Sequence, residues 1–133
     1  MWTYAQKTGN LLQDGNLVAT GYSGADEGKN NPSMQAVEDV GPIPQGNWTI
    51  SGPPVNTAEH GPYVLTLKAD TGTNTFGRSG FLMHGDSVTA PGTASKGCII
   101  MPRTAREQVW NSGDRDLEVI AEFATQDLPD QNA

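Results

Sequence analysis

The sequence predicts a mainly β protein, a β-rich α+β fold, and three features support this prediction. The 133-residue chain contains 16 glycines and 9 prolines, which are scattered as turn punctuation rather than gathered in one segment. Runs of β-branched and aromatic residues lie between them, each about as long as a short strand. Only one segment, after Cys98, carries a clear helical signal. A chain of this length fits one domain with one core, which we expect at residues 1–125.

The first part of the chain predicts a hairpin followed by a long loop. Residues 2–6, 11–12 and 17–19 form strand-like runs, and the Asp14-Gly15 pair supplies the positive φ that a tight turn needs. Residues 21–44 are rich in Gly, Asn and Pro and support at most one turn of helix. Because long loops in compact domains are often functional, this segment is a candidate functional loop.

The second part of the chain predicts the core strands and the helix. The strands are expected at residues 47–51, 63–67, 81–83, 98–101 and 117–123. Thr104 and Glu107, at capping-box spacing, predict a short helix that ends near Gly113. Residues 126–133 are polar and are expected to form a flexible C-terminal tail.

Charge and hydropathy exclude several classes of protein. With 8 basic and 15 acidic residues, the net charge of −7 repels polyanions, so no nucleic acid is expected as a partner. No apolar run approaches the roughly 18 residues of a membrane span. The polar opening of the chain has no signal-peptide core. If the protein works outside the cell that makes it, we expect export without a signal peptide.

The single cysteine is the strongest candidate for a reactive group. One cysteine forms no intramolecular disulfide and no multi-thiolate zinc site, and two histidines with one cysteine are a poor ligand set. We therefore expect no metal and no cofactor. His84 ends one predicted strand and Cys98 begins another, so an imidazole can take the thiol proton. This pair predicts a cysteine nucleophile with a histidine base.

Neighbouring residues extend this candidate site. Gly97 lets the chain approach a substrate closely and bring backbone N–H groups to a developing oxyanion. Ser95 flanks the cysteine and is a candidate hydrogen-bonding group. Asp86 is a candidate third member that orients His84, although an aspartate at a strand end is also an ordinary turn former. His60 lies in a turn signature, so we expect it to be exposed and outside the site.

The order of these residues resembles one enzyme family. Papain-like proteases place the cysteine well before the histidine, and caspases place the histidine about 50 residues before the cysteine. A short-range His84 followed by Ser95-Lys-Gly-Cys98 resembles the L,D-transpeptidases, whose motif is a His followed by Ser/Thr-His-Gly-Cys. Gly41-Pro-Ile-Pro-Gln-Gly-Asn-Trp-Thr-Ile50 is similar to the Thr-Pro-x-Gly-x-Tyr/Phe-x-Ile segment of that family.

Gly21-Tyr-Ser-Gly24 and Lys29-Asn-Asn-Pro32 extend the resemblance to residues 2–123 and to the short branch used as type VI secretion effectors. The resemblance implies an L,D-transpeptidase-like β-sandwich with one short helix after the cysteine strand. It implies an L,D-carboxypeptidase that removes the terminal D-Ala of peptidoglycan stem peptides, or a transpeptidase that exchanges D-amino acids. It also implies action in the periplasm of a target bacterium, with secretion-system components and an immunity protein as partners.

The chain departs from the family motif at two places. Lys96 stands where the second histidine is expected, and Ile100 and Pro102 replace an Arg and an Asn, although Arg103 follows at once. The alternative is a catalytically lapsed peptidoglycan-binding module of the same fold; an unrelated papain-like amidase needs the opposite chain order. The candidate substrate-binding residues are Tyr22, Tyr63, Arg78, Lys96 and Arg103.

Overall fold

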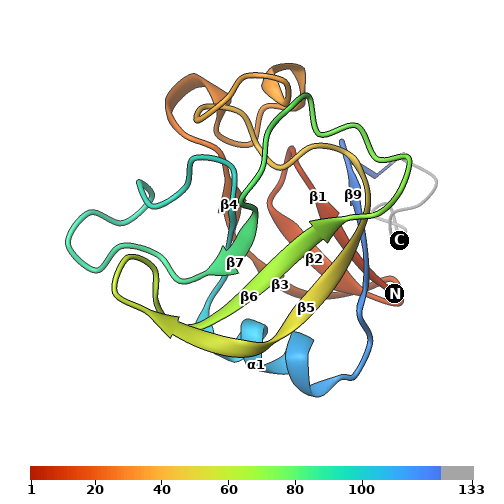
Figure 1. Ribbon diagram of the computed structural model, residues 1–133, viewed down its shortest axis with the longest axis vertical. Helices are drawn as coiled ribbons and strands as arrows, with labels where there is room; N and C mark the ends of the chain where they lie inside the picture. Colours follow the sequence, from red (N-terminus) through yellow and green to blue (C-terminus); the bar gives the residue numbers. More distant parts are fainter. Residues whose placement is uncertain (124–133) are drawn as a thin grey trace, which may run out of the picture.

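The computed structural model describes residues 1–123, in which nine strands, two 3-10 turns and one α-helix occur (Figure 1). The prediction of a mainly β fold with one short helix after the cysteine strand is confirmed. Within residues 1–123 no helix has the length and apolar character that crossing a membrane requires. The predicted tail at residues 126–133 lies outside the described residues.

Connections between strands are short up to residue 23, whereas longer segments at residues 24–45, 70–81 and 85–98 separate later strands. The strands are β1 (Trp2–Ala5), β2 (Asn10–Gln13), β3 (Asn16–Thr20), β4 (Tyr22–Ser23), β5 (Gly46–Thr57), β6 (Gly61–Ala69), β7 (Leu82–His84), β8 (Ile99–Ile100) and β9 (Asp116–Ile120). The 3-10 turns are η1 (Asp26–Gly28) and η2 (Pro32–Met34), and the helix is α1 (Arg103–Asn111).

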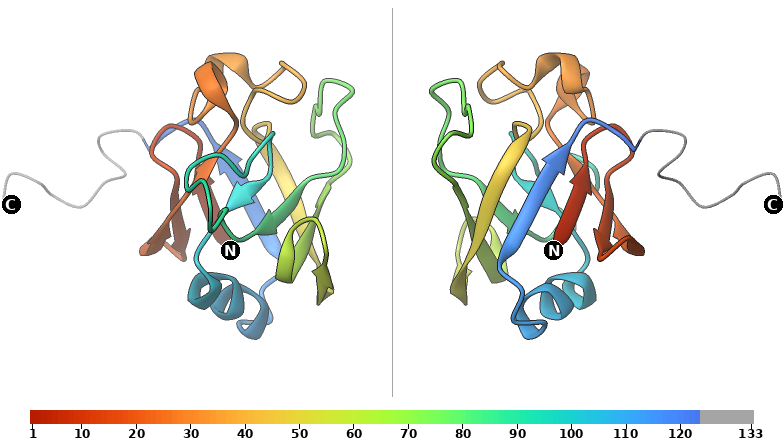
Figure 2. Two further views of the ribbon diagram at one scale, coloured as in Figure 1. Left: turned by 90° about the vertical axis from the view of Figure 1, so that its left-hand side faces the viewer. Right: turned by 90° about the vertical axis from the view of Figure 1, so that its right-hand side faces the viewer.

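All the strands belong to one mixed sheet with the order β3-β2-β1-β9-β5-β6-β7-β8-β4. Its two edge strands, β3 and β4, are joined by Gly21 alone, so the sheet curls until its edges meet. The two facing layers of the expected sandwich therefore come from one continuous sheet. Figure 2 shows α1 below one end of the curled sheet and the loops of residues 25–45 above the other.

Turn chemistry explains which strand boundaries were predicted well. Asp14 and Gly15 have φ of 49° and 85° in the β2–β3 hairpin, as the sequence predicted. The end predicted for β5 at residue 51 is wrong, because β5 continues through Gly52-Pro53-Pro54 to Thr57 with shifts of register around Val55. Pairing with β6 outweighs the local breaker signal, and the longer hairpin extends the β5–β6 turn toward the candidate site.

The start of the helix also differs from the prediction. The N-cap is Pro102, which has no side-chain cap, so the predicted capping box of Thr104 and Glu107 is wrong. Thr104 lies inside α1, and Glu107 instead lies 3.7 Å from Arg103 one turn earlier. The proline side chain has no oxygen that could accept from the N–H groups of the first turn.

The core fills the space inside the curled sheet and orients the strands of the candidate site. Trp48 meets Phe81 edge to face with ring centroids 5.1 Å apart, and the Trp48 indole N–H donates to the carbonyl of Pro44 at 3.1 Å. Met83 and Ile99 are fully buried in the same cluster. Since side chains alternate along a strand, the neighbours of these two residues face the opposite side of β7 and β8.

Closure of the sheet at Gly21 gives a testable prediction. A Cβ atom at Gly21 would lie 1.7 Å from the carbonyl oxygen of Ile100, a contact that only backbone movement relieves. We expect Gly21→Ala to lower the free energy of unfolding by about 3 kcal/mol, measured by urea denaturation. The control is Gly15→Ala, where φ is +85° and a Cβ atom would meet no atom of residues 1–123 within 4 Å apart from its chain neighbours, with an expected loss of about 1–2 kcal/mol. Equal losses would contradict a steric role for Gly21.

Candidate active site

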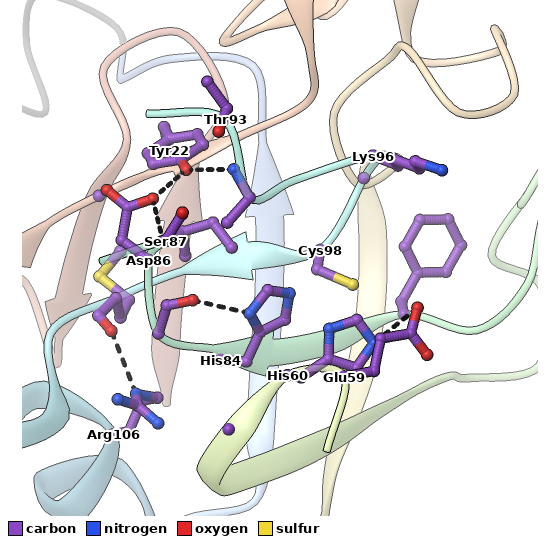
Figure 3. A pocket seen from close by; sticks show the side chains of 18 of the residues that line it. Tyr22, Glu59, His60, His84, Asp86, Ser87, Thr93, Lys96, Cys98 and Arg106 are labelled. Atoms are coloured by element: carbon purple, nitrogen blue, oxygen red, sulfur yellow. Dashed lines mark hydrogen bonds and ion pairs between the residues drawn. The ribbon is translucent and has the colours of Figure 1, made fainter. Parts of the chain in front are cut away.

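A cavity of about 1100 Å³ opens beside the ends of β7 and β8. Loops far apart in the sequence form its walls, including the β5–β6 turn, residues 78–81 and the loop between β7 and β8. Cys98, His84 and His60 lie together in this cavity (Figure 3). It exceeds the roughly 300–1000 Å³ of common small-molecule pockets, so it has room for a peptide.

Strand register brings the predicted cysteine and histidine together. β7 and β8 pair in parallel with Met83 opposite Ile99 and His84 opposite Ile100. Cys98 and Ile100 are two residues apart, so Cys98 shares a sheet face with His84. Figure 3 shows the Nε2 side of the His84 ring turned toward the Cys98 sulfur. The two residues singled out in the sequence are therefore neighbours in space.

Hydrogen bonding fixes the tautomer of His84. Its Nδ1 lies 2.8 Å from the carbonyl oxygen of Gly85, which only accepts, so Nδ1 carries the hydrogen. Nε2 is buried and has no hydrogen-bond partner among residues 1–123. The side chain is 2% exposed, and this burial is the main reason that its pKa lies below the usual value. His84 thus presents a free lone pair as a neutral imidazole.

The Cys98 thiol is also held in its uncharged form. Burial raises the pKa of the thiol, and the backbone N–H of Leu82 and the charge of Arg78 oppose this effect. A protonated thiol beside a neutral imidazole avoids a buried ion pair until reaction begins. Such a pair can transfer its proton as the sulfur attacks an electrophile.

Ser95 is the central hydrogen-bonding group of the turn before Cys98. Its hydroxyl donates to the carbonyl of Cys98 at 2.6 Å and accepts from the N–H groups of Gly24 at 2.9 Å and Gly97 at 3.1 Å. The residue is 1% exposed and lies behind the cavity wall. Ser95 therefore shapes the cysteine turn and links it to the loop after β4.

Gly97 permits a close approach, but not through the N–H group that the sequence suggested. That N–H is bound to Ser95, and the Gly97 carbonyl accepts from the Ser23 hydroxyl at 2.9 Å. With φ at +141°, a Cβ atom there would lie 2.6 Å from Nη2 of Arg78. The glycine is required because the Arg78 guanidinium packs directly against it.

Arg78 anchors loops instead of facing solvent. Its guanidinium donates to the carbonyls of Gln35 at 2.6 Å, Gly41 and Pro42 at 2.9 Å, and Lys96 at 3.2 Å. The residue is 6% exposed, and burial lowers its pKa. With its donors engaged by four backbone carbonyls, Arg78 has a structural role where the sequence suggested contact with a substrate.

Tyr22 and Asp86 brace the loop between β7 and β8. The Tyr22 hydroxyl donates to Oδ1 of Asp86 at 2.5 Å and accepts from the N–H of Ala94 at 2.9 Å. Asp86 also accepts from the N–H groups of Ser87 and Gly92. The carbonyl of Gly85, and not this carboxylate, holds Nδ1 of His84. Asp86 therefore acts as a turn former, which is the alternative role that its position at a strand end suggested.

The remaining predicted substrate residues lie at different distances from the chemistry. Lys96 and Arg103 line the cavity, and Lys96 is exposed. The Arg103 guanidinium lies 4.5 Å from the ring centroid of Tyr63, beside the cavity wall. Tyr63 is not among the lining residues. Within residues 1–123, no group of three or more His, Cys, Asp or Glu side chains is placed to hold a metal ion.

Two residues of the site were missed in the sequence. The prediction that His60 is exposed and outside the site is wrong, because its ring lies 4.4 Å from the His84 ring with an interplanar angle of 36°. Arg106, 5% exposed, donates to the carbonyls of Met101, Pro62 and Tyr63. The sequence shows that His60 lies in a turn, but where that turn lies in space depends on the full length of β5. No local sequence pattern marks Arg106 as part of the site.

The comparison with protein families finds a match over most of the chain. A family model described as the Tlde1 domain matches residues 18–121, which include the cysteine, both histidines and the loops that surround them. The chain belongs to the Tlde1 domain family. Tlde1 domains are a family of type VI secretion effectors, as the sequence resemblance led us to expect. Among curated proteins, none matches the chain significantly.

Ser95 provides the test of this Tlde1 site architecture. Ser95→Ala leaves the buried N–H groups of Gly24 and Gly97 without their acceptor. We expect the free energy of unfolding to fall by about 1–3 kcal/mol in urea denaturation. Ser79→Ala, which removes an exposed hydroxyl from the cavity rim, is the control and should stay within about 0.5 kcal/mol of the wild type. Equal stability of the two variants would contradict the central role of Ser95.

Proposed function

We propose that this Tlde1 domain is a cysteine acyl-transfer enzyme that acts on peptidoglycan stem peptides. Cys98 is the nucleophile and His84 its base. The observation that carries the proposal is the buried, unpartnered Nε2 of His84, turned toward the Cys98 sulfur while Gly85 holds Nδ1. A neutral imidazole with one nitrogen locked and the other free is arranged to accept a proton. Membership of an effector family supports an antibacterial role.

The proposed reaction has two steps, and His84 carries the proton in both. The sulfur of Cys98 attacks the carbonyl of the third stem-peptide residue while its proton passes to Nε2 of His84. Collapse of the tetrahedral intermediate breaks the peptide bond, and His84 gives the proton to the departing amine of the terminal D-Ala. The thioester is then released by water, which gives an L,D-carboxypeptidase, or by the amine of a D-amino acid, which gives exchange.

The electrostatics of the site suit this sequence of steps. Because burial raises the pKa of the thiol and lowers that of the imidazole, the resting pair is uncharged, and proton transfer accompanies attack. The cavity volume of about 1100 Å³ supports a peptide substrate. Lys96 and Arg103 are exposed cationic groups on its lining and are the candidates to meet a substrate carboxylate.

Turnover of muropeptides tests the proposed chemistry. Purified wild-type protein should remove one D-Ala from tetrapeptide muropeptides, or exchange it for D-Met when that amino acid is added, as read by mass spectrometry. We expect Cys98→Ala to lower the rate at least about a thousandfold and His84→Gln to lower it roughly 10²–10⁴-fold. Leu17→Thr, at an exposed position of the edge strand β3, is the control.

The outcomes separate the candidate functions. Turnover that survives in folded Cys98→Ala would contradict the cysteine mechanism. Binding of muropeptides without turnover by the wild type would favour the lapsed binding module. Circular dichroism should confirm that each protein is folded, so that loss of turnover cannot be attributed to unfolding.

The proposed substrate lies in the periplasm, so the compartment of expression gives a second test. We expect growth arrest of a bacterial host when the protein carries an added signal peptide, and no arrest without it or with Cys98→Ala. The physical reason is access, because the stem peptides to be cleaved are outside the inner membrane. Co-expression of a periplasmic immunity protein from the producing cell should relieve the arrest. Arrest from cytoplasmic expression alone would contradict this site of action.

A further inference from the structure

The β5–β6 hairpin brings a second imidazole onto the proposed base. His60 lies at the end of this hairpin, and its backbone N–H donates to Oγ1 of Thr57 at 2.8 Å. Its ring lies 4.4 Å from the ring of His84 at an angle of 36°, so one face of His84 is covered (Figure 3). The His60 side chain is 26% exposed, whereas His84 is 2% exposed. His60 therefore separates the base from solvent.

Arg106 anchors the start of β6, directly after His60. Nη1 of Arg106 donates to the carbonyls of Pro62 at 2.8 Å and Tyr63 at 2.7 Å, and its Nε donates to Met101 at 3.1 Å. Tyr63 has a φ of 58°, an uncommon conformation for an aromatic residue, and its N–H donates to Oδ1 of Asn56. Backbone strain of this kind persists only where the surroundings fix it. The position of His60 is thus specified by the fold.

Covering matters because, in the described part of the chain, one hydrogen bond holds the His84 ring. The bond from Nδ1 to Gly85 fixes one edge of the ring, while Nε2 has no partner there to fix the other. A ring with one anchor can still rotate unless neighbouring groups restrict it. Contact with the His60 ring supplies that restriction and also excludes water from one face of the base.

We propose that His60 is a positioning residue that covers one face of His84 and keeps its Nε2 turned toward Cys98. This inference rests on the proposed function of His84 as the base. His60 itself does not receive the thiol proton in this arrangement. Its contribution is the orientation and desolvation of the group that does.

Several charged or titratable groups surround the two rings, and they set the direction of the expected pH effects. Burial is the main cause of the low pKa of His84; His60 and Arg106 lower it further, and Asp86 raises it. The Glu59 carboxylate lies 3.8 Å from Nε2 of His60. Loss of the His60 ring exposes His84 to water and removes a repulsive neighbour, and both changes raise the pKa of His84.

Two substitutions at His60 separate shape from charge. His60→Ala removes the cover, whereas His60→Phe keeps an aromatic ring in place and removes the ring nitrogens. Val55→Thr, at an exposed position on the same hairpin, is the matched control. The chain contains two histidines, so either His60 variant leaves His84 as the only histidine signal in an NMR titration. Alkylation of Cys98 by iodoacetamide, measured against pH, reports the base without any substrate.

We expect His60→Ala to lower kcat/KM on tetrapeptide muropeptides roughly 10–100-fold, mainly through kcat, because the base is no longer held. The acid limbs of the turnover and alkylation profiles should move to higher pH, since a raised pKa keeps His84 protonated at higher pH. His60→Phe should restore most of the rate, and its acid limb should move less. A role in stability alone would change the melting temperature and leave these pH profiles in place.

The readouts distinguish failure of this inference from failure of the proposed function. If the wild type turns over muropeptides while His60→Ala leaves the rate, the alkylation profile and the His84 titration unchanged, the positioning role is overturned and the enzyme stands. If Cys98→Ala retains activity, the proposed function is overturned. The His84 titration then still reports whether His60 covers this ring, because that measurement needs no turnover.

Discussion

The parallel pairing of β7 with β8 is the constraint on which the candidate site depends. It sets His84 opposite Ile100, and the alternation of side chains then gives Cys98 the same face as His84. A shift of this register by one residue would turn the cysteine to the buried side of the sheet. The curled sheet protects the pairing, because β6 and β4 flank β7 and β8 and neither strand is an edge. The site therefore inherits its geometry from backbone hydrogen bonds rather than from side-chain contacts alone.

Two buried arginines link segments of the site that strand pairing does not join. Arg78 joins the carbonyls of residues 35–42 to the cysteine turn, and Arg106 joins the end of the β8 segment to the β5–β6 hairpin. Burial of a guanidinium is costly unless its donors are satisfied, and backbone carbonyls satisfy them here without adding a buried negative charge. Burial, and not these arginines, is the main cause of the raised pKa of the Cys98 thiol and the lowered pKa of the His84 imidazole. The proposed acyl transfer begins from this uncharged pair.

Local sequence patterns predicted strand boundaries correctly at turns where the residues themselves determine the backbone conformation. Asp14 and Gly15 adopt the positive φ of a tight turn, and the β2–β3 hairpin forms where the sequence placed it. The same reasoning ended β5 too early, because Gly52 and Pro53 are breakers in isolation. Pairing along β6 carries the strand past them. Strand length in this protein is thus decided by the partner strand, which no local window contains.

The sequence by itself determined the mainly β class and singled out Cys98 and His84, since a lone cysteine and a histidine at neighbouring strand ends are visible in the order of residues. The tertiary structure alone decided what surrounds them. His60 reaches His84 only because the hairpin extends, and Arg106 reaches that hairpin only because α1 packs below the sheet. Gly85 replaces a carboxylate at Nδ1 because backbone direction, which sequence does not encode locally, aims its carbonyl at the ring. The identities of Cys98 and His84 thus determine the chemistry that the site can perform. Long-range packing determines which groups position and cover these two side chains.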